Sequence, residues 1–386
     1  MTDAERITVT LYSDAAYYGG AEVYLSLLAR HLDPRRFRLT ALLPKDPTVP
    51  RLEEEIRAAG GEVFHHARPG FHYRASLPEL RAVLKQIGGT VLHINLPSTY
   101  DAGVGLVALA ARLAGYRRVV STEHLPMIPR RYRKFPLKIL FGEAIDRIIV
   151  PARATRSYVV ELHRMPAEKT RILPYGVEEP APVPDEEARA LREATGTRPG
   201  DVVAGIVGRL TERKGHRFLF QTLAILRREG KLPGNLRLWV IGEGEEREAL
   251  EQDARRRELS EIVRFVGPRA DAAALMALLD LLVVPSLVET TPFVVLEAMA
   301  AGRPVVASAI YGIPEMIEDG RSGRLVPPAD PEALARALEE PLAGGPDLRA
   351  RWGRRARELY EERFAAPVMA RGTEAIYLGL DGERAS

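Results

Sequence analysis

Two glutamates flank the start of an apolar segment and suit a shared ligand. Glu289 lies just before a segment that we expect to be helical. Thr291 suits the N-cap, Pro292 suits the first helical position, and Gly302 marks the stop. Glu297 is the only charged residue inside this helix, and its side chain leans back towards the start. Because helix starts attract anions, the pattern favours a phosphate flanked by hydroxyl-rich groups, as in a nucleoside diphosphate joined to a sugar.

The backbone N–H groups near the helix start are the candidate donors of hydrogen bonds to that phosphate. They belong to Thr290, Thr291, Phe293 and Val294, whereas Pro292 has no N–H. A second interpretation stays open from spacing alone. In it, Glu297 pairs with an arginine in a buried helix and serves packing only.

A loop between two glycines carries two cations that suit a diphosphate. The strand expected at Val202–Val207 is followed by the loop Gly208–Gly215, which holds Arg209 and Lys214. Arginine offers a planar fork of N–H groups, and lysine offers a point charge. The alternative is that both are ordinary exposed loop charges. The loop is not a P-loop, because Gly-x-x-x-x-Gly-Lys-Ser/Thr is absent.

These stretches resemble the donor-site motifs of retaining glycosyltransferases with the two-domain GT-B architecture. The group is the large family 4, which includes sucrose synthases and many bacterial lipid and polysaccharide glycosyltransferases. The resemblance lies in Gly-Arg-Leu-x-x-x-Lys-Gly from Gly208, and in Glu289 followed after seven residues by Glu-Ala-Met-Ala-Ala-Gly from Glu297. One departure is Thr-Thr-Pro from Thr290, where relatives often have an aromatic residue and a glycine. Another is Tyr175, where an asparagine is common.

The resemblance implies a reaction and its catalytic residues. A hexosyl group would move from a nucleotide diphosphate sugar, UDP by family frequency, to an acceptor hydroxyl on the same face. Arg209 and Lys214 would stabilise the leaving phosphate, Glu289 would orient the sugar, and His124 would lie near its outer hydroxyls. No cofactor or metal is expected, because the protein supplies the cations and no Asp-x-Asp motif occurs.

The resemblance also implies how the nucleotide sugar is held. Glu297 would accept hydrogen bonds from the ribose hydroxyls. Glu243 would lie near the nucleotide in a Gly-acid-Gly turn, and Val266 would meet the base at a strand end. Gly19 and Gly20, in the first strand-to-helix turn, would let the backbone approach the ligand closely.

Alternating strand and helix patterns predict the fold. They indicate an α/β protein with two Rossmann-like, doubly wound parallel sheets facing across a cleft. The first domain is expected at 1–177, completed by about 365–386, and the second at 178–364.

The first domain carries the candidate acceptor contacts, which are Tyr18, His93 and Asn95. The stretch 129–141 mixes basic, aromatic and aliphatic residues without an acid, which is typical of an interface with anionic lipid. Its alternative is a solvated loop. We expect a sugar, lipid-linked or polysaccharide acceptor.

Composition excludes several classes of protein. The chain has 386 residues, a formal net charge of +3 and no cysteine. This balance does not indicate a nucleic-acid binder, and no apolar run is long enough to span a membrane. We expect a cytoplasmic protein, with peripheral contact at the inner face of the membrane. Two alternatives remain: a nucleotide-sugar 2-epimerase or other GT-B-fold enzyme, and a non-catalytic sugar-nucleotide-binding protein.

Overall fold

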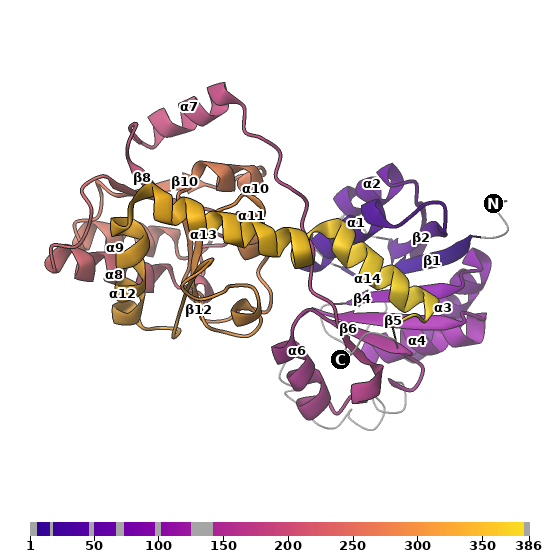
Figure 1. Ribbon diagram of the computed structural model, residues 1–386. Helices are drawn as coiled ribbons and strands as arrows, with labels where there is room; N and C mark the ends of the chain where they lie inside the picture. The colour runs from indigo at the N-terminus through magenta and orange to yellow at the C-terminus, as the bar shows by residue number, and fades with distance from the viewer. Residues whose placement is uncertain are drawn as a thin grey trace. The chain divides into compact units, whose positions relative to one another are not determined.

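The computed structural model describes residues 6–15, 18–45, 50–66, 73–96, 102–124 and 142–381. The chain divides into two compact units (Figure 1). Unit 1 comprises Met1–Gly176 and Ala366–Ser386, and unit 2 comprises Val177–Ala365. The stretch 129–141, for which we expect a membrane contact, lies outside the described residues. The expected pair of parallel-sheet α/β domains is confirmed.

Unit 1 is built on a seven-stranded parallel sheet in the order β3-β2-β1-β4-β5-β6-β7. Its strands are β1 (Ile7–Tyr12), β2 (Phe37–Pro44), β3 (Glu62–His66), β4 (Val91–Leu96), β5 (Arg118–Glu123), β6 (Arg147–Val150) and β7 (Thr170–Ile172). Its helices are α1 (Gly20–His31), α2 (Pro50–Ala58), α3 (Tyr73–Ile87), α4 (Ala102–Ala114), α6 (Arg153–Ser157) and α14 (Ala366–Leu378). Helices α3 and α4 lie side by side (Figure 1), and their apolar residues share one core with β4.

Unit 2 is built on a six-stranded parallel sheet in the order β10-β9-β8-β11-β12-β13. Its strands are β8 (Val202–Val207), β9 (Leu236–Ile241), β10 (Val263–Gly267), β11 (Leu281–Val284), β12 (Val305–Ser308) and β13 (Gly323–Val326). Its helices are α7 (Asp185–Ala194), α8 (His216–Arg228), α9 (Arg247–Arg256), α10 (Ala272–Leu275), α11 (Phe293–Ala300), α12 (Pro331–Ala343) and α13 (Gly345–Leu359). All six residues of β8 are buried, as expected for a central strand covered on both faces.

The polypeptide crosses between the units twice, after Gly176 and after Ala365. Within unit 2, Val177 N–H donates to Phe364 O at 2.9 Å, so the outgoing and returning segments are paired there. After the second crossing, α14 packs against α1 of unit 1. This C-terminal helix is therefore part of the first sheet's hydrophobic cover.

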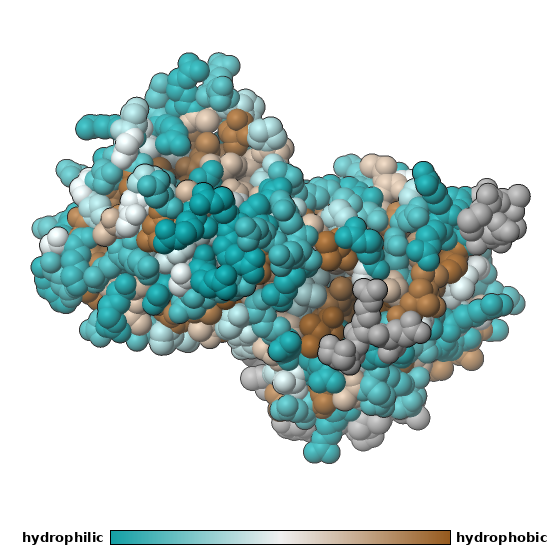
Figure 2. All heavy atoms as spheres, in the orientation of Figure 1, coloured by the Kyte–Doolittle hydropathy of each residue, from teal (hydrophilic) through white to brown (hydrophobic). Residues whose placement is uncertain are grey.

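The visible surface of both units is mainly hydrophilic, with apolar side chains in small patches (Figure 2). The exposed large apolar residues in the described part of the chain are Leu113, Leu162, Ile172, Val288, Tyr311 and Leu380. None of the described helices has the length and apolar character needed to cross a bilayer.

Candidate active site

The carboxyl ends of β8, β9 and β11 meet at one edge of unit 2. Gly215 has a φ of 72°, and a Cβ on it would lie 1.9 Å from Pro285 O. Gly242 has a φ of 144°, and a Cβ on it would lie 1.9 Å from Gly208 O. These close approaches require glycine and bring three loops together. They are Gly208–Gly215 after β8, Gly242–Gly244 after β9, and Pro285–Pro292 after β11. The charged residues expected in these three loops thus follow strands at one edge of one sheet; they are Arg209, Lys214, Glu243 and Glu289.

Lys214 and Glu289 are paired at the centre of this edge. Lys214 Nζ donates a hydrogen bond to Glu289 Oε1, and Ser286 Oγ donates to the same oxygen at 3.3 Å. The two charged side chains are 24% and 11% exposed. A short turn, Glu212–Lys214, closed by the left-handed Gly215, fixes the start of the lysine side chain. A cation suited to phosphate thus lies beside a carboxylate suited to sugar hydroxyls.

Arg209, the second expected cation, extends into solvent. Its side chain is 80% exposed, and its nearest acidic partner is Glu245 at 4.0 Å. A surface pair of this length contributes little to stability, so the guanidinium is free to turn towards an anion.

Helix α11 starts one residue later than the sequence suggests. Pro292 occupies the N-cap with ψ of 124°, and no side chain caps the helix. The assignment of Thr291 as N-cap and Pro292 as the first helical residue is therefore wrong. The prediction used the high frequency of proline at the first helical position. Here, however, the ψ angle of Pro292 is that of extended backbone, so the residue precedes the helix. Gly312 N–H donates to Thr290 O at 3.0 Å and braces the segment before the helix.

The side-chain carboxyl of Glu297 has no hydrogen bond or ion pair to any residue that the structure describes. Its surroundings raise its pKa to about 7, because burial disfavours the charged carboxylate. The interpretation of Glu297 as a packing partner of an arginine therefore finds no support. Thr291 Oγ1 is likewise buried without a partner among the described residues.

Glu243 and Val266 extend the same edge towards the outer strand of the sheet. Glu243 accepts a hydrogen bond from Arg247 at 2.7 Å, and this contact lowers its pKa. Val266 lies in β10 and is partly exposed. The structure places both residues across β8 from Glu289 and Glu297.

The glycine turn of unit 1 begins α1. Gly19 is the N-cap, Gly20 is the first helical residue, and Gly19 N–H donates to Glu22 Oε2 at 3.0 Å. Tyr18 O–H donates to Glu55 Oε2 at 2.6 Å, and the Arg51 guanidinium lies 4.4 Å from the Tyr18 ring centroid. Burial and the bond to Glu55 raise the pKa of Tyr18 far above its ordinary value.

His124 is held between two partners inside unit 1. Asn95 donates its Nδ2–H to Ala21 O at 3.0 Å, so its Oδ1 accepts from His124 Nε2 at 2.7 Å. His124 Nδ1 then accepts from Tyr175 O–H at 2.7 Å. Burial lowers the pKa of His124 to about 3, which keeps the ring neutral. Both nitrogens of the ring are therefore bonded within the unit, and its side chain is almost fully buried.

His93 lies deeper in the same core. Its Nδ1 is 2.5 Å from Tyr377 Oη, and its Nε2 is 2.6 Å from Thr122 Oγ1. The ring is wholly buried, and burial lowers its pKa to about 3. His93 thus anchors α14 to the sheet, and it presents no surface to an acceptor in this arrangement. The hydroxyl partners Tyr175, Thr122 and Tyr377 were missed by the sequence interpretation, which had no signal for contacts between distant segments.

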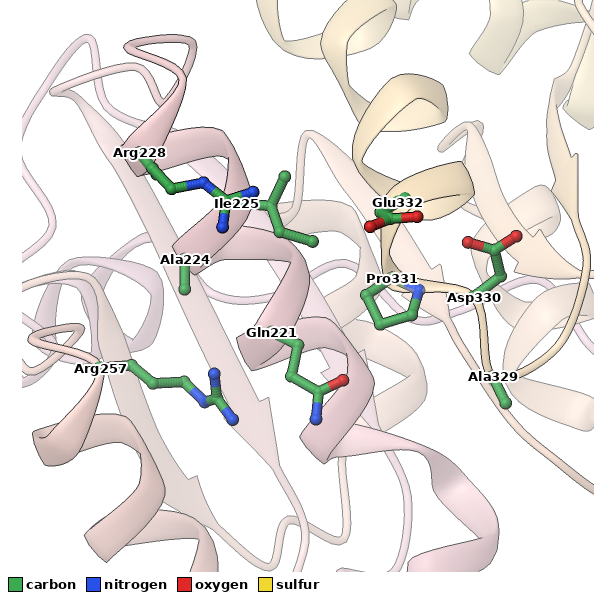
Figure 3. Close-up of a pocket in the computed structure, with 9 residues that line it drawn as sticks. All are labelled: Gln221, Ala224, Ile225, Arg228, Arg257, Ala329, Asp330, Pro331 and Glu332. Carbon is green, nitrogen blue, oxygen red and sulfur yellow. The ribbon is translucent and has the colours of Figure 1, made fainter.

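A separate groove of about 800 Å³ lies on unit 2 between α8 and the start of α12 (Figure 3). Its lining includes Gln221, Ile225, Arg228, Arg257 and Glu332, and it contains none of the residues singled out from the sequence. Among the described residues, no group of three or more His, Asp or Glu side chains is arranged to hold a metal ion.

Two family models match the chain. The model described as "Glycosyl transferases group 1" matches residues 201–343, and that described as "Glycosyltransferase Family 4" matches residues 18–179. A GDP-mannose-dependent alpha-(1-6)-phosphatidylinositol monomannoside mannosyltransferase of Mycolicibacterium smegmatis is 30% identical over 345 residues, which are 84% of this chain and 86% of that relative. The lipopolysaccharide core biosynthesis glycosyltransferase LpsE of Rhizobium meliloti is 36% identical over 159 residues, 41% of this chain and 44% of that relative.

A solved structure shares the fold over nearly the whole length. The crystal structure of Anabaena Alr3699/HepE in complex with UDP has a TM-score of 0.80 to this chain and 21% sequence identity. The match covers 97% of this chain and 100% of that one.

Proposed function

We propose, from the premise that this chain belongs to glycosyltransferase family 4 and has the GT-B fold, that it is a retaining hexosyltransferase using a UDP-sugar. That the protein is a glycosyltransferase follows from its family. The proposal concerns the donor, the stereochemistry and the independence from metal ions. The observation that carries it is the Lys214–Glu289 pair at the carboxyl ends of β8 and β11, followed in α11 by Glu297, whose carboxyl has no partner among the described residues.

The residues of this edge support a same-face substitution. The bond between the anomeric carbon and the β-phosphate oxygen breaks, and its electron pair stays on the phosphate. The acceptor oxygen bonds to the anomeric carbon on the same face, and its proton passes to the departing phosphate oxygen. Lys214, Arg209 and the start of α11 stabilise the charge that develops there.

Neither Glu289 nor Glu297 acts as a covalent nucleophile in this scheme. A retaining glycosidase uses two carboxylates about 5 Å apart across the bond. Here Glu297 is assigned to the ribose hydroxyls, and Glu289 is paired with Lys214 while it orients the sugar. His124 takes no part in this scheme, because both nitrogens of its ring are bonded within unit 1. Catalysis then depends on positioning and electrostatics.

Donor and acceptor follow from the known proteins by analogy. UDP is bound in the Anabaena structure, whereas the Mycolicibacterium relative is named as GDP-mannose-dependent, so both bases need testing. The printed names of the relatives refer to a phosphatidylinositol monomannoside and a lipopolysaccharide core. We therefore propose a lipid-linked or polysaccharide acceptor, with peripheral membrane contact through residues 129–141.

To test the proposal, the protein is incubated with UDP-, GDP- and ADP-sugars, with and without EDTA. The quantity measured is the rate of nucleotide release. We expect slow hydrolysis of one UDP-sugar, insensitive to EDTA and lost in Lys214→Ala and Glu289→Ala. Arg228→Ala, in the groove of Figure 3, is the control that should retain it. An epimerised nucleotide sugar as product would establish the epimerase alternative. Nucleotide binding without turnover on any acceptor would point to the non-catalytic one.

A further inference from the structure

We propose that Thr291 determines donor specificity, because its side-chain hydroxyl binds a ring hydroxyl of the transferred sugar. This inference rests on the proposed function, which places the nucleotide sugar at the edge formed by β8, β9 and β11. From the sequence, Thr291 is expected as the N-cap of the helix and as a backbone donor to the phosphate, and its hydroxyl is given no contact with the sugar. The side chain now receives a role of its own.

The first observation is a buried hydroxyl without a partner. Thr291 is 4% exposed, and its Oγ1 makes no hydrogen bond within the part of the chain that the structure describes. A buried hydroxyl usually has a partner, because leaving one unpaired is unfavourable. A group that is kept in this condition beside a binding site is a candidate ligand contact.

The second observation is the position of this hydroxyl in the chain and in the fold. Thr291 lies two residues after Glu289, whose carboxylate is held by Lys214, and two residues before the start of α11. It is therefore bracketed by the residue assigned to the sugar and by a helix start suited to phosphate. Rotation about one side-chain bond would redirect the hydroxyl among staggered positions.

The chemistry of the hydroxyl favours the sugar over the phosphate. Lys214 and Arg209 already supply positive charge for the diphosphate. A threonine hydroxyl can donate and accept at once, which matches a sugar hydroxyl. A site that bonds a substrate hydroxyl discriminates against an analogue that places it differently. Thr291 would thus discriminate between donor sugars that differ in the configuration of one ring carbon.

The experiment is Thr291→Val, which keeps the shape and removes only the hydroxyl. Without nucleotide sugar, its thermal stability should equal or exceed that of the wild type, because an unpartnered polar group has been removed. Its KM for the preferred UDP-sugar should rise about two- to tenfold, the range for one neutral hydrogen bond. The Kd for UDP alone should not change, and the preference between two donor epimers should weaken by the same factor.

Thr222→Val is the matched control. Thr222 Oγ1 is buried but lies 2.9 Å from Phe218 O and 3.1 Å from Pro331 O, so it has partners. This variant should lose stability and keep the wild-type KM. The proposal is overturned if Thr291→Val is destabilised as Thr222→Val is, if UDP binding falls with UDP-sugar binding, or if epimer preference is unchanged.

A parallel assay separates this inference from the proposed function. If Lys214→Ala still turns over the donor at the wild-type rate, the proposed function itself fails. If Lys214→Ala is inactive while Thr291→Val behaves as wild type towards every donor, only the role of Thr291 fails.

Discussion

Lys214 and Glu289, which are 75 positions apart in the sequence, share a hydrogen bond at the carboxyl edge of the unit 2 sheet. Lysine is the group expected to hold a phosphate, and glutamate the group expected to orient a sugar. Their contact means that phosphate binding must compete with Glu289 for the same ammonium group. The interaction between Lys214 and Glu289 therefore contributes to the stability of unit 2 and also affects the affinity of unit 2 for the nucleotide sugar.

A double-mutant cycle should reveal this coupling. Lys214→Ala leaves a mostly buried carboxylate without its cation, so we expect the free energy of unfolding to fall by about 1–3 kcal/mol. The double variant Lys214→Ala/Glu289→Ala should recover part of that loss. Turnover should fall about 100-fold or more in Lys214→Ala, because charge on the leaving phosphate is no longer stabilised. Additive stability losses, measured by urea unfolding, would contradict the coupling.

The raised pKa of Glu297 predicts a pH-dependent stability. Below the ordinary glutamate pKa, both folded and unfolded chains carry the neutral acid. As pH rises towards 7, the unfolded chain ionises first, and stability is lost up to the folded pKa of about 7. Glu297→Gln has no group that titrates at this position. The free energy of unfolding of the variant, relative to that of the wild type, should therefore increase by up to about 3 kcal/mol between pH 4.5 and 8. Urea unfolding at both pH values is the measurement.

Glu297 should also make nucleotide affinity depend on pH. Ribose hydroxyls donate better to a carboxylate than to a carboxylic acid, so binding should tighten as pH rises from 6 to 8. Titration calorimetry with UDP should show more proton release in the wild type than in Glu297→Gln, where only the terminal phosphate of UDP and groups other than Glu297 contribute. The same pH dependence in both proteins would remove Glu297 from the ribose contact.

The two buried histidines of unit 1 predict sensitivity to acid. Their folded pKa values of about 3 lie below the ordinary histidine value, so they contribute stability above pH 6.5. This stability is lost as pH falls towards 3, by about 1.4 kcal/mol per pH unit for each ring. His93→Gln should reduce the slope of stability between pH 6 and 4.5 by about that amount. An unchanged slope would show that the His93 ring is already charged or exposed.

Gly215 should not tolerate a side chain. Its φ of 72° and the 1.9 Å approach of a Cβ to Pro285 O predict that Gly215→Ala shifts the turn that carries Lys214. Gly230 is a matched control, because its φ is 67° but no atom lies within 4 Å of the added Cβ. Gly230→Ala should lose about 1–2 kcal/mol from backbone strain alone. Gly215→Ala should lose more stability and also turnover, as measured by melting and donor hydrolysis.

The sequence indicated the sheets well because their strands are continuous apolar runs. β8 and β11 are buried throughout, so each reads as a short apolar segment ending in a polar loop. The positions of Lys214 and Glu289 at strand ends followed from this pattern. The start of α11 did not, because the choice of N-cap depends on the ψ angle of Pro292, which residue preferences do not determine.

The polar core of unit 1 could not be read from the sequence. His93 and Tyr377 are 284 positions apart, and no local pattern links them. His124 was expected near the sugar, but its bonds to Asn95 and Tyr175 depend on three separate segments meeting. That the Glu297 carboxyl has no partner in the described part of the chain could not be predicted either, because this depends on how the side chains around α11 pack. Such features are properties of the tertiary structure and have no local sequence pattern.

The return of the chain to unit 1 sets an order for the synthesis and folding of the protein. Unit 2 is a continuous stretch, Val177–Ala365, whereas unit 1 needs α14 from the end of the chain. Until Tyr377 has left the ribosome, His93 lacks one hydrogen-bond partner and Asp33 N–H lacks Glu374. A nascent chain can thus complete the sheet of unit 2 while unit 1 still lacks the helix α14 that packs against α1. Unit 1 is therefore the first of the two units to be synthesised and the last to be completed.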